Sequence, residues 1–314
     1  MLYRYVARRL FATIPVMAVV AIVVFLLLRL TTGDPAAIIA GDNATSQQVE
    51  QIRAKLGLDR PLVQQFAIWL GNLAHGDFGE SFFFKKRVSE LIADRLEPTA
   101  ALATFTIVLA VALAVPLGVT AAYQRGTWVD RAVMGMSVLG FSVPAFVIGY
   151  TLIYVFAIQL AWLPVQGYQR LADGFGGFIE RLILPSLTLA VIYVALIARI
   201  TRGSVLEVLD ADYVRTARAK GLADLGVLVR HVLKNAAVPI VTVIGLGVAL
   251  LIGGVVVTES VFSIPGLGRL TVDAVLARDY PTVQAVVLLF SLVYVLINLL
   301  VDLTYTLFDP RIRY

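Results

Sequence analysis

The stretch that decides the fold reads DADYVRTARAKGLADLGVLVRHVLKN, residues 210–235, and it lies between two long apolar runs. It carries five basic residues: Arg215, Arg218, Lys220, Arg230 and Lys234. We call this segment the basic arm. A polar segment between two apolar spans must lie in water, because charges are costly in hydrocarbon. The basic arm is therefore predicted to present a docking surface in the cytoplasm.

Local signals predict two short helices in the basic arm. Asp212 is a favourable helix start and Gly221 a favourable stop, which together give a helix over residues 213–220. Asp224 begins a second helix that ends at about Lys234. The elbow between them is small and weakly polar, so it can enter a groove on a partner while the surrounding arginines fix its orientation.

Composition places the chain in a membrane. Of its 314 residues, 59% are apolar and only 15% are charged, and the mean hydropathy is +0.87, which leaves too little polar surface for a soluble domain. There is no cysteine, and His75 and His231 lie far apart, so we expect no metal site. The net charge of +5 comes from basic residues that flank spans, which argues against nucleic acid binding.

Six stretches are long and apolar enough to cross a bilayer, which takes roughly 20 residues per helix. They are Leu10–Leu30, Thr99–Tyr123, Ala132–Leu160, Leu182–Ile200, Val238–Val257 and Val283–Phe308. Basic residues flank them at Arg4, Arg8, Arg9, Arg125, Arg131, Arg311 and Arg313. If the spans alternate, these residues and the basic arm share one side. The positive-inside rule then predicts a multi-pass membrane protein with both termini in the cytoplasm, and the resemblance described below implies the bacterial inner membrane.

The predicted organisation has four parts. Residues 1–31 form the N-terminal tail and first span, which we interpret as a retained anchor because no A-x-A cleavage site follows it. Residues 32–98 form an extracytoplasmic region. Residues 99–310 form a core of five helices with a cytoplasmic loop at 201–236, and residues 311–314 form a cytoplasmic tail.

Short helices are predicted in the extracytoplasmic region. Ser46 can cap a helix that ends at Gly57, and Pro61 suits the first turn of another that runs through Leu73. An apolar stripe at helical spacing follows, made of Val88, Leu91, Ile92 and Leu96. Two interpretations stay open: a small cap packed on the spans, or a docking platform for an external partner.

Several residues inside the spans invite a functional interpretation. Proline and glycine there usually serve kinks and close packing, but the glycines of the fifth span also make it the best candidate to line a pore. The pore or gate candidates are Pro144, Phe146, Gly245, Gly253, Glu259 and Phe262. The ionisable residues near span ends, Arg29, Arg199, Glu259 and Asp302, are expected to snorkel or to find a partner. For Asp302, with Asn298 nearby, a structural hydrogen bond or ion pair is favoured over a transport role.

The basic arm resembles the coupling loop of bacterial ABC importer permeases. Their general E-A-A, three residues, G signature is matched only at Ala217 and Gly221, because Arg215 and Thr216 replace E-A. The version found in the dipeptide, oligopeptide, nickel and glutathione importers fits better, through YVRTARAKG at residues 213–221 and HVLKN at 231–235. Further similar motifs are Gly33-Asp34-Pro35, residues 56–59, residues 76–79, residues 142–146, Glu259, residues 265–269 and residues 309–314.

This resemblance implies an all-α type I ABC importer permease, similar to the first permease subunit, the dipeptide permease B type. It further implies a second homologous permease, two ABC ATPases that hold ATP and Mg²⁺, and an extracytoplasmic substrate-binding protein. The residues expected to couple to the ATPase are Tyr213, Arg215, Thr216, Ala217, Arg218, Lys220, Gly221, Leu222 and Ala223. We expect this chain to bind no cofactor itself.

The sequence supports one part of that picture independently. No G-x-x-x-x-G-K-[ST] phosphate loop occurs, so the motive force must come from a partner or an ion gradient. One alternative is an ion-coupled secondary transporter, which would need inverted repeats and a mid-membrane site. A membrane enzyme is another, but G-x-S-x-G and H-E-x-x-H are absent.

Short peptides are the favoured substrate, ahead of glutathione, nickel and other small solutes.

Overall fold

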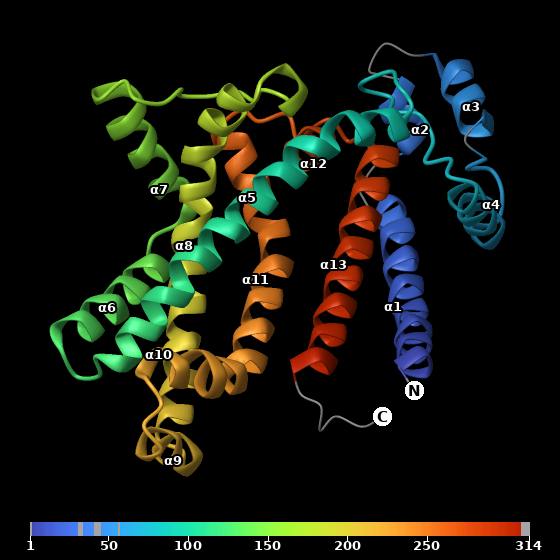
Figure 1. The fold of residues 1–314 in the computed structure, drawn as a ribbon. Coiled ribbons are helices and arrows are strands. Elements are labelled where there is room, and N and C mark those ends of the chain that lie inside the picture. The colour runs from blue at the N-terminus through green and yellow to red at the C-terminus, as the bar shows by residue number, and fades with distance from the viewer. Residues whose placement is uncertain (1, 31–33, 41–44, 56, 309–314) are drawn as a thin grey trace. The chain divides into compact units, whose positions relative to one another are not determined.

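The computed structural model describes residues 2–30, 34–40, 45–55 and 57–308 (Figure 1). They divide into two compact units. The first contains Met1–Leu10, Leu96–Arg269 and Tyr294–Tyr314, and the second contains Phe11–Arg95 and Leu270–Val293. These units group residues by contact. The predicted division by membrane side is a different property and stays a prediction.

Helices make up nearly all of the described regular structure. The long helices are α1 (Leu2–Leu30), α5 (Val88–Tyr123), α8 (Phe175–Leu209), α11 (Lys234–Val261) and α13 (Tyr280–Phe308). The shorter ones are α2 (Pro35–Ala40), α3 (Ser46–Lys55), α4 (Leu62–Ala74), α6 (Trp128–Ser142), α7 (Ala145–Leu152), α9 (Asp212–Ala219), α10 (Asp224–Val227) and α12 (Leu267–Leu276). Two π-helical segments, η1 (Ile153–Gln159) and η3 (Leu228–Leu233), and one 3-10 turn, η2 (Leu171–Asp173), complete the set.

Within the described residues, four helices are long and apolar enough to cross a membrane. They are α5, α8, the continuous helix Asp224–Val261 and Tyr280–Thr304 of α13. The bent pair α6 and α7–η1 gives a fifth if it is one span, and α1 holds a shorter apolar helix, Phe11–Leu26. Each of the six predicted spans overlaps one of these elements, so the all-α membrane fold is confirmed.

The third predicted span, Ala132–Leu160, is wrong as a continuous helix. It consists of α6 and α7–η1, which meet at an angle of 104°. Pro144 has no N–H to donate and disfavours helical geometry at the residue before it. Val143 accordingly adopts an extended conformation, with φ −97° and ψ 125°.

Two helices are longer than predicted. The apolar stripe that starts at Val88 and the second span form one helix, α5, with Pro98 and Pro116 inside it. The second helix of the basic arm also runs on into the fifth span, so that Asp224–Val261 is continuous. The gap before the second span contains Pro98, which α5 accommodates within the helix, and the gap before the fifth span contains only Asn235, Ala236 and Ala237, none of which stops a helix.

The predicted cap of α3 is off by one residue. Thr45 lies before the helix and Ser46 is its first residue. The N–H of Gln48 donates to Thr45 Oγ1 at 3.4 Å, and the N–H of Thr45 donates to Gln48 Oε1 at 2.8 Å. This is a capping box, in which each side chain accepts the other residue's N–H, and the N–H of Gln48 also donates to the carbonyl of Thr45 at 3.0 Å. Gly57 does follow the helix with a positive φ of 65°, as predicted.

Helix α8 lies at the centre of the first unit and packs against α6, α7 and α11 (Figure 1). Leu182, Leu189 and Ile197 on α8 are fully buried. Close approach to α5 depends on Gly118, where an added Cβ would lie 2.6 Å from the carbonyl oxygen of Ala198. Small residues at such contacts are typical of membrane helices, whose association is driven by packing.

The second unit has a thinner core. Ala21 and Val24 of α1 pack with Leu288 of α13. Phe25 contacts the α4 side chains Phe66 and Trp69, with ring centroids 5.0 and 5.5 Å away.

A buried carboxylate ties the loop before α5 to the start of α13 within the second unit. Asp279 accepts hydrogen bonds from Ser81 Oγ, from the N–H of Phe82 (3.3 Å) and from Thr282 Oγ1 (2.7 Å). Its exposure is 1%. These bonds fix the loop that contains residues 81–87 against α13.

Candidate functional site: the basic arm and the pore candidates

Helix α9 of the basic arm is amphipathic. Val214 and Ala217 are buried, and the remaining side chains from Asp212 to Lys220 are exposed. Tyr213, Arg215, Thr216, Arg218 and Lys220 therefore lie on the accessible face that was predicted for them. Ala217, also among the predicted coupling residues, is buried, and its role in coupling, like that of its neighbours, stays a prediction.

The elbow after α9 is a Schellman motif, as the glycine signal predicts. The N–H of Gly221 donates to the carbonyl of Arg218 (2.9 Å), and the N–H of Leu222 donates to that of Ala217 (3.4 Å). Gly221 has φ +80°, and an added Cβ would meet no atom within 4 Å. The glycine is thus required by the backbone conformation, while its surface stays open. Leu222 is half-buried and Ala223 is exposed.

An apolar cluster holds the basic arm to the ends of three long helices. Val214 and Ala217 pack with Val205 of α8, Ala122 of α5 and Ile240 of α11. The other buried members are Val227, Val232 and Ala236. Burying a valine-sized side chain contributes about 1.5–3 kcal/mol. The cluster therefore makes the basic arm a packed extension of α5, α8 and α11.

Two ion pairs lie beside this attachment, one between α6 and α8 and one between the start of the basic arm and Arg125. Arg202 of α8 forms a bidentate pair with Asp130 of α6, with 2.7 Å between Nη2 and Oδ2. The Asp130 side chain is 7% exposed, and it also accepts the N–H of Gly126 at 2.9 Å. A second pair, Arg125 with Asp210 at 3.6 Å, is exposed. The buried pair was not predicted from the sequence, although an acidic residue beside a span on the basic side was a usable signal.

The exposed face of the basic arm combines charge with apolar side chains. Leu225 is 72% exposed and Val229 is 55% exposed, and neither was predicted as a contact. Arg218 forms an ion pair with Asp224 at 3.7 Å across the elbow. The exposed tip therefore combines apolar side chains with basic residues, of which Arg215 and Arg218 are paired with exposed carboxylates.

The pore candidates do not share one environment. Gly253 has open space around it, whereas a Cβ on Gly245 would lie 2.1 Å from Val301 Cγ2 of α13, so Gly245 serves close packing. Phe146 is 49% exposed, just after Pro144, which caps α7. Phe262 is buried and lies near Gly149 of α7. Their role in a pore stays a prediction.

Glu259 is fully buried and organises the segment that follows α11. It accepts from Thr99 Oγ1 (2.6 Å) and from the N–H of Arg269 (2.9 Å), while Thr99 Oγ1 accepts the N–H of Leu267 (2.8 Å). The two side chains thus satisfy the first N–H groups of α12, where a negative charge is favourable. A Cβ on Gly266 would lie 2.0 Å from Glu259 Oε1, which explains the glycine there.

The remaining flagged residues are accounted for as follows. Asn298 is exposed and Asp302 is half-buried. Arg199 lies over the ring of Phe141, 5.4 Å from its centroid, which is the kind of partner expected for a cation near a span end. The side chain of Arg29 and residues 309–314 lie outside the described part of the chain.

Outside the spans, burial and then the nearby Glu97 carboxylate raise the pKa of Tyr168 above its ordinary value. The Tyr168 hydroxyl therefore stays protonated and donates to Glu97 Oε1 at 3.1 Å. Among the described residues, no group of three or more His, Cys, Asp and Glu side chains could hold a metal ion.

Comparison with known proteins now decides the family. Residues 114–314 match the family described as binding-protein-dependent transport system inner membrane component, and residues 1–103 match its N-terminal family. The chain belongs to this family. Its members are ABC importer permeases, so the resemblance noted from the coupling loop is confirmed.

Relatives agree over the whole length. The chain is 57% identical over 310 residues to the probable peptide ABC transporter permease protein y4tP of Sinorhizobium fredii, with 99% of each chain covered. It is 46% identical over 314 residues to a putative peptide transport system permease protein of Brucella melitensis, with 100% of each covered. It is also 46% identical over 310 residues to the glutathione transport system permease protein GsiC of Escherichia coli, with 99% of each covered.

A solved structure supports the fold. The permease of the MetNI methionine ABC transporter, in an inward-facing conformation, aligns with a TM-score of 0.58 over 70% of this chain and 96% of that one. At 17% sequence identity, this similarity supports the fold alone.

Proposed function

We propose that this permease forms half of the translocation pathway for short peptides in an ABC importer and that the basic arm couples it to an ATPase. The names of the relatives at 57% and 46% identity support the peptide substrate. Glutathione, itself a small peptide, is the second candidate, because a glutathione permease matches over 99% of the chain.

The observation that carries the coupling proposal is the build of the basic arm. Its exposed tip holds Leu225 and the basic residues of α9, while its buried face is continuous with α5, α8 and α11. A displacement applied to the tip is transmitted to those helices because the apolar cluster packs the arm against them, and the Asp130–Arg202 pair in turn ties α8 to α6. Tilting of α8 and α11 would then open the pathway to one side of the membrane or the other.

The partners follow from this proposal. A second, homologous permease completes the pathway, two ABC ATPases bind ATP and Mg²⁺ and perform the hydrolysis, and an extracytoplasmic binding protein delivers the peptide. The family and its bacterial relatives favour a bacterial inner membrane location, and the basic flanks of the spans favour an orientation with the basic arm and both termini in the cytoplasm. ATP hydrolysis is thus assigned to partner chains, in keeping with the absence of a phosphate loop from this sequence.

The test uses the whole transporter in proteoliposomes, with peptide-loaded binding protein and ATP supplied on the appropriate sides. Gly221→Pro should abolish the elbow, because proline cannot adopt φ +80° and cannot donate the 2.9 Å hydrogen bond to Arg218. We expect peptide uptake to fall at least about tenfold, the equivalent of roughly 1.4 kcal/mol, while the protein remains in the membrane. ATP hydrolysis should no longer be stimulated by loaded binding protein.

Gly76→Pro is the matched control. Gly76 also follows a helix with a positive φ of 76°, donates its N–H to a carbonyl three residues earlier and has open space around it. It lies outside the basic arm, so uptake should stay coupled to hydrolysis. Normal uptake by Gly221→Pro would contradict the coupling role, and uptake that persists without ATP but collapses with the ion gradients would contradict the importer mechanism as a whole.

A further inference from the structure

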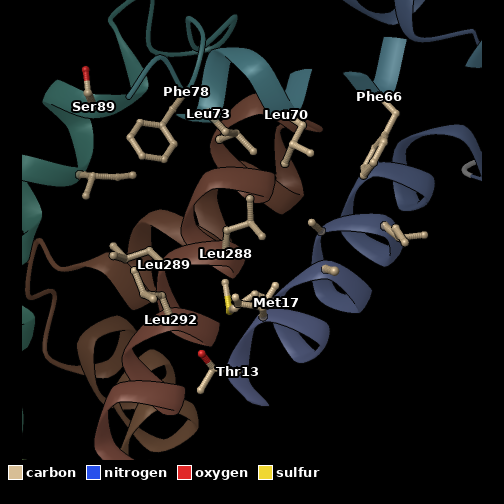
Figure 2. A pocket seen from close by; sticks show the side chains of 15 residues that line it. Thr13, Met17, Phe66, Leu70, Leu73, Phe78, Ser89, Leu288, Leu289 and Leu292 are labelled. Atoms are coloured by element: carbon tan, nitrogen blue, oxygen red, sulfur yellow. The ribbon is translucent and has the colours of Figure 1, made fainter. Parts of the chain in front are cut away.

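An apolar cavity of about 710 Å³ lies within the second unit, between α1, α4, the start of α5 and α13 (Figure 2). Its size falls in the range of ligand pockets, about 300–1,000 Å³. None of its 15 lining residues is charged, and only Thr13 and Ser89 bear a hydroxyl. Figure 2 shows Met17 of α1 facing Leu288 of α13, with Leu70 and the side chains near it closing the end away from Thr13.

Water is a poor occupant of this cavity. A buried water needs two to four polar partners, and two hydroxyls at separate places do not supply them. An empty cavity is also unfavourable, because the lining atoms lose their dispersion contacts. The physical chemistry therefore calls for an apolar occupant.

The walls indicate where such an occupant comes from. The wall formed by α1 belongs to its apolar helix Phe11–Leu26, and the wall formed by α13 belongs to a helix that is long and apolar enough to cross the membrane. Ile14 and Ile22, which line the cavity on α1, are themselves 59% and 45% exposed. A cavity that opens between such helices opens to lipid, whose acyl chains have the required chemistry.

A cationic cluster lies in the sequence just before the α5 segment that lines the cavity. Lys85, Lys86 and Arg87 are exposed and immediately precede the α5 segment that supplies Ser89. Glu80 and Glu90 flank the cluster in sequence, which leaves a local excess of one positive charge over residues 80–90. Basic clusters beside a membrane helix attract anionic headgroups.

The cluster is also held in place. The N–H of Lys85 donates to the carbonyl of Ser81 (3.0 Å), and the Ser81 hydroxyl donates to buried Asp279 at the start of α13. The same unit therefore fixes both the cationic cluster and the α13 wall of the cavity. A headgroup at the cluster and a chain in the cavity could be bound by one rigid site.

We propose that this cavity binds one acyl chain of an anionic phospholipid whose phosphate lies at Lys85, Lys86 and Arg87. The site is separate from the basic arm and does not depend on which solute is transported. Its occupant stabilises the packing of α1 on α13.

The first test fills the cavity. Ala18 lines it and is exposed, so Ala18→Phe places a ring in the space that the chain would occupy. Val19→Phe is the matched control, because Val19 is 60% exposed on the same helix but does not line the cavity. The whole transporter is released from nanodiscs of phosphatidylglycerol and phosphatidylcholine into a native mass spectrometer. We expect Ala18→Phe to retain one phosphatidylglycerol fewer per permease than the unchanged protein and Val19→Phe, and equal retention in all three would overturn the proposal.

The second test identifies the occupant directly. The chain has no cysteine, so Ala18→Cys gives a single attachment point on it for a benzophenone maleimide, with Val19→Cys as the control. Irradiation should yield a phospholipid adduct on Ala18→Cys several-fold more often than on Val19→Cys. A conjugate with a neighbouring protein chain instead would assign the cavity to a protein partner and overturn the lipid assignment.

The third test concerns the headgroup. Replacing Lys85, Lys86 and Arg87 by glutamine should remove the preference for phosphatidylglycerol over phosphatidylcholine while the number of retained lipids stays the same. Replacing Lys220, an exposed cation of the basic arm, should leave the preference unchanged. A preference that survives the triple substitution would overturn the assignment of the phosphate to this cluster.

Discussion

Asp130 in the first unit and Asp279 in the second are both buried, with exposures of 5% and 1%, but they are stabilised in different ways. Asp130 is held mainly by one cation, Arg202, in a bidentate pair. The donors to Asp279 include two hydroxyls and one backbone N–H, from Ser81, Thr282 and Phe82. The first arrangement concentrates the stabilisation in one side chain, and the second distributes it over several.

This difference fits the two regions. The Asp130–Arg202 pair joins α6 to α8 beside the basic arm, where a force would be transmitted. The Asp279 network fixes the loop that contains residues 81–87, where several modest bonds suffice. The contrast predicts that removing a single partner will lower the stability of the two regions by unequal amounts.

The largest effect should come from Arg202→Met. It leaves the Asp130 carboxylate buried and unpaired, a change that typically costs about 3–5 kcal/mol. Thermal unfolding of the purified transporter should show a clear fall in the midpoint. Arg125→Met is the control, because the Arg125–Asp210 pair is exposed and should contribute no more than about 1 kcal/mol. If both variants lost the same stability, the distinction between the two pairs would be wrong.

Asp279→Ala should have an intermediate effect. It leaves the Ser81 and Thr282 hydroxyls without their acceptor, and an unsatisfied buried polar group costs about 1–3 kcal/mol. The loop should also become easier to cleave with trypsin after Lys85, Lys86 or Arg87, which a timed digest of membranes would detect. Asp77→Ala removes an exposed acceptor of the N–H of Gly79 and serves as the control. If Asp279→Ala lowered the stability more than Arg202→Met does, the proposed difference between the two carboxylates would be wrong.

The smallest effect should come from Thr45→Ala, which removes an exposed hydroxyl of the capping box. The expected loss is about 1 kcal/mol, as for other helix caps, and it should be confined to α3. Hydrogen exchange at the N–H of Gln48 should accelerate, whereas Thr45→Ser should restore protection. Unchanged exchange in Thr45→Ala would show that the 3.4 Å bond between Gln48 N and Thr45 Oγ1 contributes nothing.

Features that depend on local sequence were predictable. Apolar runs of sufficient length located the spans, and Gly221 located the end of α9, because only a glycine adopts φ +80° at low cost. The accessible residues of α9 also followed from its charge pattern. The inward orientation of Ala217 did not, because a motif states which residues occur together and says nothing about which face they occupy.

Features that depend on contacts between distant segments were not predictable. Asp130 and Arg202 are separated by 72 residues, and no local pattern relates them. Proline alone did not predict where a span is broken. The helix ends before Pro144 but continues through Pro116, because a proline in a span can end a helix or be accommodated within it. The outcome depends on the neighbouring helices.

The length of α5 has a consequence of its own. Its 36 residues make a rod of about 54 Å, whereas the hydrocarbon layer is about 30 Å thick. All of its charges, Glu90, Asp94, Arg95 and Glu97, lie in the first ten residues. This charged first segment of α5, which we call the stub, is about 15 Å long and must therefore lie outside the hydrocarbon layer. Deleting one residue from the stub would move the charges before the deletion around the helix by about 100°, so they would lie on a different face of α5.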